Sequence, residues 1–279
     1  MTEALGGTTP AESARGGDAV RTEGATRAET AALPLSGRSA VVTGGASGIG
    51  EACAREFARL GASVTVADLN GAEAERVAAD IGGTAWQVDL ADTRALEAAT
   101  LDTDILVNNA GIQRIDPVHE YDPETWRLIH RLMLESPFLL IRAALPGMYR
   151  RGFGRIINIS SVHGLRASAF KSAYVSAKHG LEGLSKVTAL EGGEHGVTSN
   201  CINPAYVRTP LVERQIADQA TLHGIPESEV VAKVMLTESA VKRLVEPEEV
   251  ASLAAWLASP MAGMVTGASY TMDGGWTAR

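Results

Sequence analysis

Short runs of apolar and β-branched residues alternate with longer amphipathic stretches from about residue 37 to the C-terminal end of the chain. The runs that predict buried strands are Ser39–Thr43, Ser63–Ala67, Asp104–Val107, Arg155–Ile159, Thr198–Ile202 and Ala268–Met272. The stretches that predict helices are Ile49–Leu60, Ala72–Ile81, Tyr174–Leu190 and Pro247–Leu257, with room for only about two helical turns in Ala91–Thr100. This alternation predicts one doubly wound α/β domain, a parallel sheet with helices on both faces.

The first 36 residues lack this pattern. They contain no Ile and no aromatic residue, and they offer too little apolar surface to offset the entropy of ordering. They also lack the apolar core of a signal peptide, and their five acidic residues argue against a transit peptide. We therefore predict a disordered N-terminal tail over 1–36 and a catalytic domain over 37–279; the alternative is an arm that packs on a neighbouring subunit.

Composition excludes several classes of protein. The 279 residues are 45% hydrophobic and 21% charged, with a formal net charge of −8, which argues against nucleic-acid binding. The longest apolar runs fall short of the ~20 residues that a membrane span needs. Two cysteines, Cys53 and Cys201, are too few for a disulfide framework and favour a reducing compartment. We predict a cytoplasmic protein without nucleic-acid or membrane partners.

A glycine-rich segment, Thr43–Gly50, joins the first strand to the first helix. Glycines at this junction allow a tight turn and close approach of a pyrophosphate, which the following helix N-terminus also favours. The spacing is G-x-x-x-G-x-G, and the alternative interpretation is an ordinary glycine-rich turn. The candidate cofactor-binding residues of this segment are Gly44, Ser47, Gly48, Ile49 and Gly50.

Asp68 ends the second strand, 18 residues beyond Gly50. A carboxylate at this position can accept hydrogen bonds from the 2′-hydroxyl of an adenosine ribose and would repel a 2′-phosphate. No Lys or Arg occurs between Thr43 and Gly50 to compensate that repulsion. The sequence therefore favours NAD over NADP, although Asp68 could instead cap a helix unless the nearby Asn70 does so.

Tyr174 and Lys178 are spaced i, i+4, which places them on one face of a helix, and Ser161 follows the strand that ends at Ile159. A phenol titrates near pH 10, and an ammonium ~4–6 Å away favours the phenolate and lowers its pKa. General-base catalysis by Tyr174 then becomes feasible near neutral pH. The alternative is a surface pair whose lysine extends into solvent.

Together these motifs, with Asn108–Gly111 and Pro204, resemble the short-chain dehydrogenase/reductase family over residues 37–279. The resemblance implies a Rossmann-type fold, hydride transfer to a nicotinamide cofactor, no metal and a homotetramer. It also implies that Tyr174 is the acid/base, that Ser161 orients the substrate oxygen, and that Lys178 assists Tyr174 and binds the cofactor. Further cofactor-binding positions implied by the resemblance are Asp89, Asn109, Ala110, Gly111, Pro204, Val207 and Thr209.

Two positions depart from the family pattern. Met133 stands where the family commonly has an asparagine that feeds a proton relay, and a thioether is only a weak acceptor and no donor. His130, one turn earlier, could contribute to the relay or simply face solvent. Pro204-Ala205 replaces the usual Pro-Gly near the nicotinamide. Loss of turnover, leaving an NAD sensor or scaffold, is the alternative that Met133 raises.

The segments that single out a group within the family are Ser161–Gly164, Lys171–Tyr174, Arg208–Glu213 with Gln215, and Asp273–Thr277. They most resemble those of the D-3-hydroxybutyrate dehydrogenases. The resemblance implies a small anionic substrate, whose carboxylate is held by Gln113, His163, Lys171 and Gln215, with Tyr206 and Trp276 at the pocket. Because the protein is acidic overall, we expect Lys171 and His163 to supply the local positive charge. Residues 206–241 are expected to form a helical lid. The alternative is another small alcohol, hydroxy acid or ketone as substrate.

Overall fold

The computed structural model describes residues 33–278, and residues 1–32 of the predicted tail lie outside them. Residues 33–36, the end of that predicted tail, belong to the folded unit. Leu35 is fully buried in the main core, and its backbone N–H donates to the carbonyl of Leu60 at 2.9 Å. The folded domain therefore begins a few residues before position 37.

Seven parallel strands form one sheet in the order β3-β2-β1-β4-β5-β6-β7, which confirms the doubly wound fold. Their bounds are Ser39–Thr43 (β1), Ser63–Asp68 (β2), Thr84–Gln87 (β3), Ile105–Asn108 (β4), Gly154–Ile159 (β5), Val197–Pro204 (β6) and Ser269–Met272 (β7). The sequence pattern gave no bounds for β3, because this edge strand is mostly exposed and lacks a buried apolar run. Strand order reverses between β1 and β4, where such folds bind ligands.

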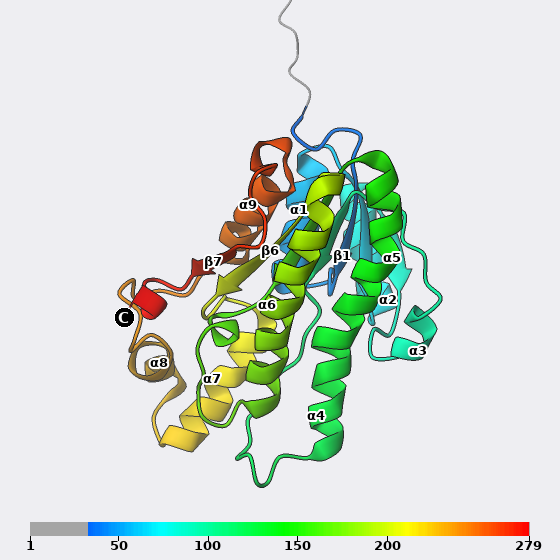
Figure 1. Cartoon of the computed structure of the whole chain (residues 1–279). Helices are drawn as coiled ribbons and strands as arrows, with labels where there is room; N and C mark the ends of the chain where they lie inside the picture. The colour runs from blue at the N-terminus through cyan, green and yellow to red at the C-terminus, as the bar shows by residue number, and fades with distance from the viewer. Residues whose placement is uncertain (1–32, 279) are drawn as a thin grey trace, which may run out of the picture. The chain divides into compact units, whose positions relative to one another are not determined.

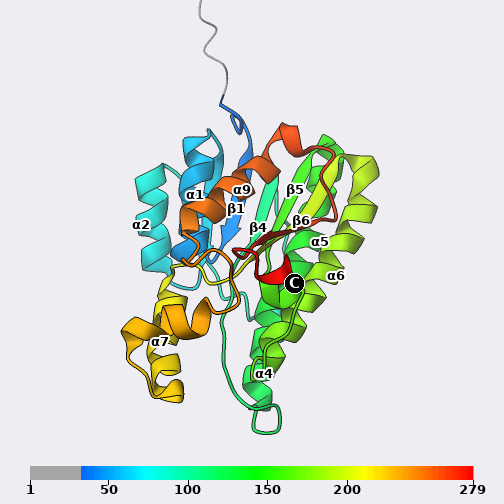
Figure 2. The same cartoon turned by 90° about the vertical axis from the view of Figure 1, so that its left-hand side faces the viewer.

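Helices cover both faces of the sheet (Figure 2). One face carries Gly48–Arg59 (α1), Gly71–Ile81 (α2) and Pro247–Ala258 (α9), and the other carries Pro123–His130 (α4), Ser136–Arg151 (α5) and Ser172–Gly192 (α6). A π-helical turn, Arg131–Glu135, joins α4 to α5. The element between β3 and β4, Thr93–Leu96 (α3), is a single turn capped by Asp92, shorter than the two turns predicted.

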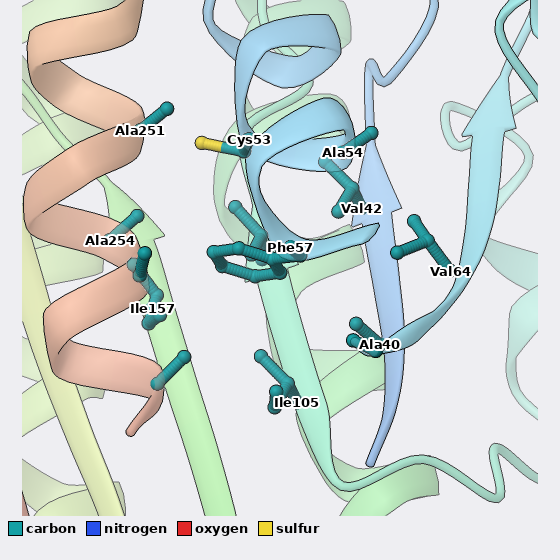
Figure 3. Close-up of a cluster of buried hydrophobic side chains, with 14 of the residues drawn as sticks. Ala40, Val42, Cys53, Ala54, Phe57, Val64, Ile105, Ile157, Ala251 and Ala254 are labelled. Carbon is teal, nitrogen blue, oxygen red and sulfur yellow. The ribbon is translucent and has the colours of Figure 1, made fainter. Parts of the chain in front are cut away.

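The core beneath α1 and α9 is built from complementary apolar faces (Figure 3). Phe57 of α1 is fully buried and points toward Ala254 of α9 and Ile157 of β5. Alanines on α9 allow the two helices to approach closely, so Phe57 fills the space between them and the sheet. This packing fixes α1, whose N-terminus follows the glycine-rich segment.

The predicted lid segment is helical beyond the carboxyl end of β6 (Figure 1). It contains Pro210–His223 (α7), Glu227–Val230 (α8) and a π-helical turn, Val231–Met235. Val212, Val230 and Met235 form its own small buried cluster. The segment is thus anchored internally, and its closure over ligands stays a prediction.

Candidate active site

A cavity of about 560 Å³ lies at the carboxyl ends of the strands. All the residues that the sequence predicted to contact cofactor or substrate line it, except Gly50. They come from the ends of β1 to β6 and the loops that follow them, from α6 and α7, and from the C-terminal turn Trp276–Ala278. The carboxyl ends of parallel strands meet at one edge, so residues far apart in sequence converge here.

The glycine-rich segment is held against the loop after β4. Gly44 has φ +59°, and a Cβ there would lie 2.9 Å from Asn109 Nδ2. Asn109 Nδ2 donates to the carbonyls of Thr43 and Gly44 at 3.0 and 3.1 Å, so Asn109 fixes the shape of the segment. Gly50 does not line the cavity; it is buried, and a Cβ there would lie 2.0 Å from the Gly44 carbonyl oxygen. Gly50 therefore permits close packing and does not itself face a ligand.

Asp68 lines the cavity at the end of β2. Its Oδ2 accepts a hydrogen bond from the backbone N–H of Ala46 at 3.1 Å, and its Oδ1 accepts one from Asn70 at 3.0 Å. The cap of α2 is Asn70, whose side chain accepts from the N–H of Glu73. The alternative role of Asp68 as a helix cap is therefore excluded.

Apolar walls flank Asp68 and Asp89 in this half of the cavity. They are Leu69, Val88 and Leu90, which sequence reasoning missed. Each one adjoins a predicted cofactor residue, Leu69 following Asp68 and the other two enclosing Asp89. Their position just beyond β2 and β3 was the signal that could have identified them.

Ser161 and Tyr174 meet in the other half of the cavity. Ser161 follows β5, and its Oγ accepts a hydrogen bond from the backbone N–H of His163 at 3.2 Å. Tyr174 lies in the first turn of α6. Burial raises the pKa of Tyr174, and a hydrogen bond with the Ser161 side chain opposes that rise. The lowered pKa expected for Tyr174 is therefore not found.

Lys178 lies one turn further along α6 and is 4% exposed. Its Nζ is 5.6 Å from the ring centre of Tyr174 and donates to the carbonyl of Ile159 at 2.6 Å. Burial lowers the pKa of Lys178 to about 8. The group thus remains predominantly an ammonium at neutral pH and favours the phenolate form of Tyr174.

His163 is buried and stays neutral at physiological pH. Burial, followed by the nearby charge of Lys171, lowers the pKa of His163 to about 3. Its Nδ1 is 3.3 Å from Ser161 Oγ and its Nε2 is 2.9 Å from Ser168 Oγ. The expectation that His163 supplies positive charge is therefore wrong, because the ring is desolvated and both nitrogens face hydroxyl groups.

Lys171 supplies the buried cation that the sequence predicted. It is 6% exposed, and burial alone lowers its pKa to about 8. Its Nζ lies 5.5 Å from the ring centre of Tyr206, and it has no ion-pair partner among the side chains that the structure describes. Gln113 Nε2, also in the cavity wall, is buried without a hydrogen-bond partner in the described structure. Lys171 and Gln113 are therefore donors in the cavity wall for which the described structure supplies no acceptor.

The lid and the C-terminal turn complete the wall around these donors. Gln215 of α7 is 8% exposed. The Trp276 ring meets the His163 ring edge-on, with 5.6 Å between their centres. Asp273 holds the turn by accepting hydrogen bonds from Gly275 and Thr277. The predicted substrate residues therefore surround one end of the cavity.

Met133 also lines the cavity and is 1% exposed. It packs with Ile129, Ala173 and Ala177, so it is an apolar core residue. His130 faces elsewhere: its Nδ1 is 2.8 Å from the Trp126 carbonyl oxygen and its Nε2 is 2.9 Å from Ser176 Oγ. His130 does not line the cavity, and its suggested part in a proton relay finds no support.

Two searches of the described residues bear on other functions. No helix within residues 33–278 is long and apolar enough to cross a membrane. Among the side chains that the structure describes, no group of three or more His, Cys, Asp or Glu could hold a metal ion.

Comparisons with known proteins cover the whole folded domain. A family model described as enoyl-(acyl carrier protein) reductase matches residues 44–277. A D-beta-hydroxybutyrate dehydrogenase of Rhizobium meliloti is 45% identical in an alignment of 256 positions that covers 87% of this chain and 99% of that protein. One from Cupriavidus necator is 41% identical in an alignment of 257 positions that covers 88% of this chain and 100% of that protein.

Solved structures share the fold but differ in their named substrates. A protein of Agrobacterium tumefaciens assigned as a 2-deoxy-D-gluconate 3-dehydrogenase, with bound NADP, has a TM-score of 0.78 and 32% identity, covering 89% of this chain and 100% of its own. One of Beutenbergia cavernae assigned as an NAD(P)-dependent gluconate 5-dehydrogenase, with NADP at low occupancy, has a TM-score of 0.79 and 34% identity, with the same coverage.

Proposed function

The chain belongs to the short-chain dehydrogenase/reductase family, and from that premise we propose that it oxidises (R)-3-hydroxybutyrate to acetoacetate with NAD. The observation that carries the substrate proposal is the pair of buried donors without acceptors, Lys171 and Gln113, in one cavity with Ser161 and Tyr174. A buried ammonium is costly unless an anion compensates it. A small carboxylate supplies that anion.

The residues of the cavity fit a nicotinamide dinucleotide. Positive φ values at Gly44 and Gly48, with side chains packed closely behind both glycines, leave a backbone cradle of the kind that accommodates a pyrophosphate. Asp68, Asp89 and the walls at Leu69, Val88 and Leu90 would hold the adenosine, and Lys178 and Thr209 would hold the nicotinamide end. When bound, the cofactor accepts hydride from the carbon that bears the hydroxyl.

NAD is proposed over NADP because of the charge at the end of β2. Asp68 faces the cavity there, and the lining residues whose side chains are described include no arginine that could bind a 2′-phosphate. The only lysines in the wall are Lys171 and Lys178, which lie beside Tyr206 and Tyr174. The named structural relatives contain NADP, so a direct comparison of the two cofactors is part of the test.

The chain's own residues perform the proton chemistry in this proposal. Tyr174 accepts the proton of the substrate hydroxyl, with Ser161 holding the substrate oxygen. Lys178 stabilises the phenolate against the desolvation that raises the pKa of Tyr174. Lys171 pairs with the substrate carboxylate, Gln113 and Gln215 donate to it, and neutral His163 orients Ser161 and supports Trp276.

The test is a matrix of initial rates, followed by NADH or NADPH absorbance, with the full-length protein. (R)-3-Hydroxybutyrate, its (S) enantiomer, its methyl ester and gluconate are each supplied with NAD and with NADP. We expect the highest kcat/KM for the (R) acid with NAD, and a large loss for the neutral ester. Preference for gluconate, or equal rates with the ester, would overturn the substrate proposal; preference for NADP would overturn the cofactor proposal.

Assembly and location are separate proposals. We propose a cytoplasmic homotetramer, from the family resemblance and from the two free cysteines, which favour a reducing compartment. Light scattering of the purified protein checks the mass of the assembly. A monomer or dimer at micromolar concentration would contradict the tetramer.

A further inference from the structure

A carboxyl group is buried directly behind the active site. Glu182 lies on α6 one turn after Lys178 and is 4% exposed. Its Oε1 accepts a hydrogen bond from Asn203 Nδ2 at 2.5 Å, and its Oε2 accepts one from Ser269 Oγ at 2.6 Å. Carboxylates are almost never fully buried unless they are paired, so the burial of Glu182 needs an explanation.

Asn203 connects this carboxyl group to Ser161. Asn203 is fully buried at the end of β6, and its Nδ2 also donates to the backbone carbonyl of Ser161 at 2.9 Å. Both partners of the amide nitrogen are acceptors, which fixes the orientation of the side-chain amide and uses both of its N–H groups. The main chain at Ser161 is therefore tied, through Asn203, to α6.

The loop that carries Ser161 is shaped to admit the carboxyl group. Gly164 closes the short 3₁₀ helix Val162–Gly164, and a Cβ at this position would lie 2.9 Å from Glu182 Oε1 and 2.5 Å from Ser160 Oγ. Any side chain there would displace either the loop or Glu182. The contact between Glu182 and this loop thus depends on the missing side chain of Gly164.

Glu182 also acts electrostatically on Lys178. The titratable groups that face Lys178 are Tyr174 and Glu182 on α6 and Cys201 on β6. Burial and Glu182 raise the pKa of the Cys201 thiol, which is therefore neutral at physiological pH. Burial lowers the pKa of Lys178, and the nearby Cys201 and Glu182 oppose that lowering; Glu182 is the carboxyl group of the pair.

We propose that Glu182 is a positioning residue for the reaction, which holds the main chain of Ser161 through Asn203 and places a negative charge one helical turn from Lys178. Neither Glu182 nor Asn203 lines the cavity, so both act through residues that do. The inference rests on the proposed oxidoreductase chemistry at Ser161, Tyr174 and Lys178, and it does not depend on which substrate is oxidised.

The deciding variant is Glu182→Gln. Glutamine retains both hydrogen bonds, because its Oε1 can accept from Asn203 and its Nε2 can donate to Ser269 Oγ, while the charge is lost. With lysines labelled at ¹³Cε, the NMR resonance of Lys178 should titrate ~0.5 to 1 pH unit lower in the variant than in the natural chain. The high-pH limb of kcat should move in the same direction, since Lys178 loses its proton earlier.

Asn203→Ala tests whether the hydrogen bond from Asn203 to the main chain of Ser161 contributes to catalysis. It removes the hydrogen bond to Ser161 but keeps the Glu182 charge, so we expect kcat to fall on the order of tenfold with little change in the position of the pH limbs. Ser185→Ala is the matched control, because Ser185 is also buried on α6 and hydrogen-bonded to β6, at 2.9 Å to Ser199 Oγ, without a link to Ser161. This control should leave kcat and the Lys178 titration unchanged.

The outcomes separate this inference from the proposed function. If the Lys178 titration and the pH profile of Glu182→Gln match those of the natural chain, Glu182 is only a structural residue and the inference is overturned. If Asn203→Ala fails to fold by circular dichroism, the Glu182→Gln result decides alone. A natural chain that is inactive on 3-hydroxybutyrate refutes the substrate proposal only, because the NMR titration needs no substrate.

Discussion

Replacing Lys171 by methionine tests the anion site most directly. Methionine retains an apolar stem of similar length and removes the charge. Burial lowers the pKa of Lys171 from 10.5 to about 8. Since one pKa unit corresponds to 1.36 kcal/mol, keeping this ammonium charged in the folded protein costs about 3 kcal/mol. A bound carboxylate would recover up to that amount. Because 1.4 kcal/mol corresponds to a factor of ten, Lys171→Met should raise KM for (R)-3-hydroxybutyrate roughly a hundredfold.

The lowered pKa of Lys171 also predicts that Lys171→Met stabilises the fold, by an amount that depends on pH. Lys171 has a lower pKa in the folded than in the unfolded state, so it destabilises the fold fully below pH 8, and this effect is relieved as pH rises from about 8 to 10.5. At pH 7 the Lys171→Met variant should therefore unfold at a higher urea concentration. Its free energy of unfolding should exceed that of the natural chain by up to about 3 kcal/mol. The advantage over the natural chain should shrink above pH 8.

The assay combines steady-state kinetics, NAD binding by calorimetry and urea unfolding. Lys186→Met, the same change at an exposed position of α6, is the matched control and should alter neither KM nor stability. KM for the methyl ester and the affinity for NAD should stay within about twofold in Lys171→Met. A KM for the acid within twofold of the natural value would refute the role of Lys171.

Three further substitutions test other parts of the structure. Tyr174→Phe should reduce kcat by on the order of 10³-fold while circular dichroism shows an intact fold, and substantial turnover would exclude Tyr174 as the base. Asp68→Ala should lower the ratio of kcat/KM with NAD to that with NADP by roughly tenfold, and an unchanged ratio would show that Asp68 does not select the cofactor. Leu35→Ala should lower the free energy of unfolding by about 2–4 kcal/mol in urea titrations, whereas no loss would mean that Leu35 contributes nothing to the core.

Local sequence patterns were sufficient for every strand except β3, because a short run of apolar and β-branched residues is a signal within a single segment. They were insufficient where burial depends on distant partners. Leu35 lies in a short segment with no helix or strand periodicity, and it is buried because its backbone bonds to Leu60 and its side chain joins the α1 core. The edge strand β3 was not predicted because it pairs on one side only and remains exposed, so its sequence contains no buried apolar run.

At the site, the sequence predicted which residues converge but not their states of charge. His163 was expected to be a cation, and only the structure shows that Ser161 and Ser168 occupy the surroundings of its ring nitrogens. The loop that presents Lys171 depends on a backbone feature that no pattern revealed. Phe170 adopts φ +68°, unusual for a residue with a side chain, and its carbonyl accepts from Asp116 N at 2.9 Å.

The two buried lysines of the cavity show why one is free to bind a ligand. Both have their pKa lowered to about 8 by burial, so desolvation alone does not distinguish them. Lys178 donates to the Ile159 carbonyl and has Glu182 one turn away, so the protein itself compensates its charge. Among the described side chains, Lys171 has no compensating anion and meets the face of the Tyr206 ring at a distance where the attraction is weak. An anion entering the cavity therefore gains most by pairing with Lys171, which leaves Lys178 available to act on Tyr174.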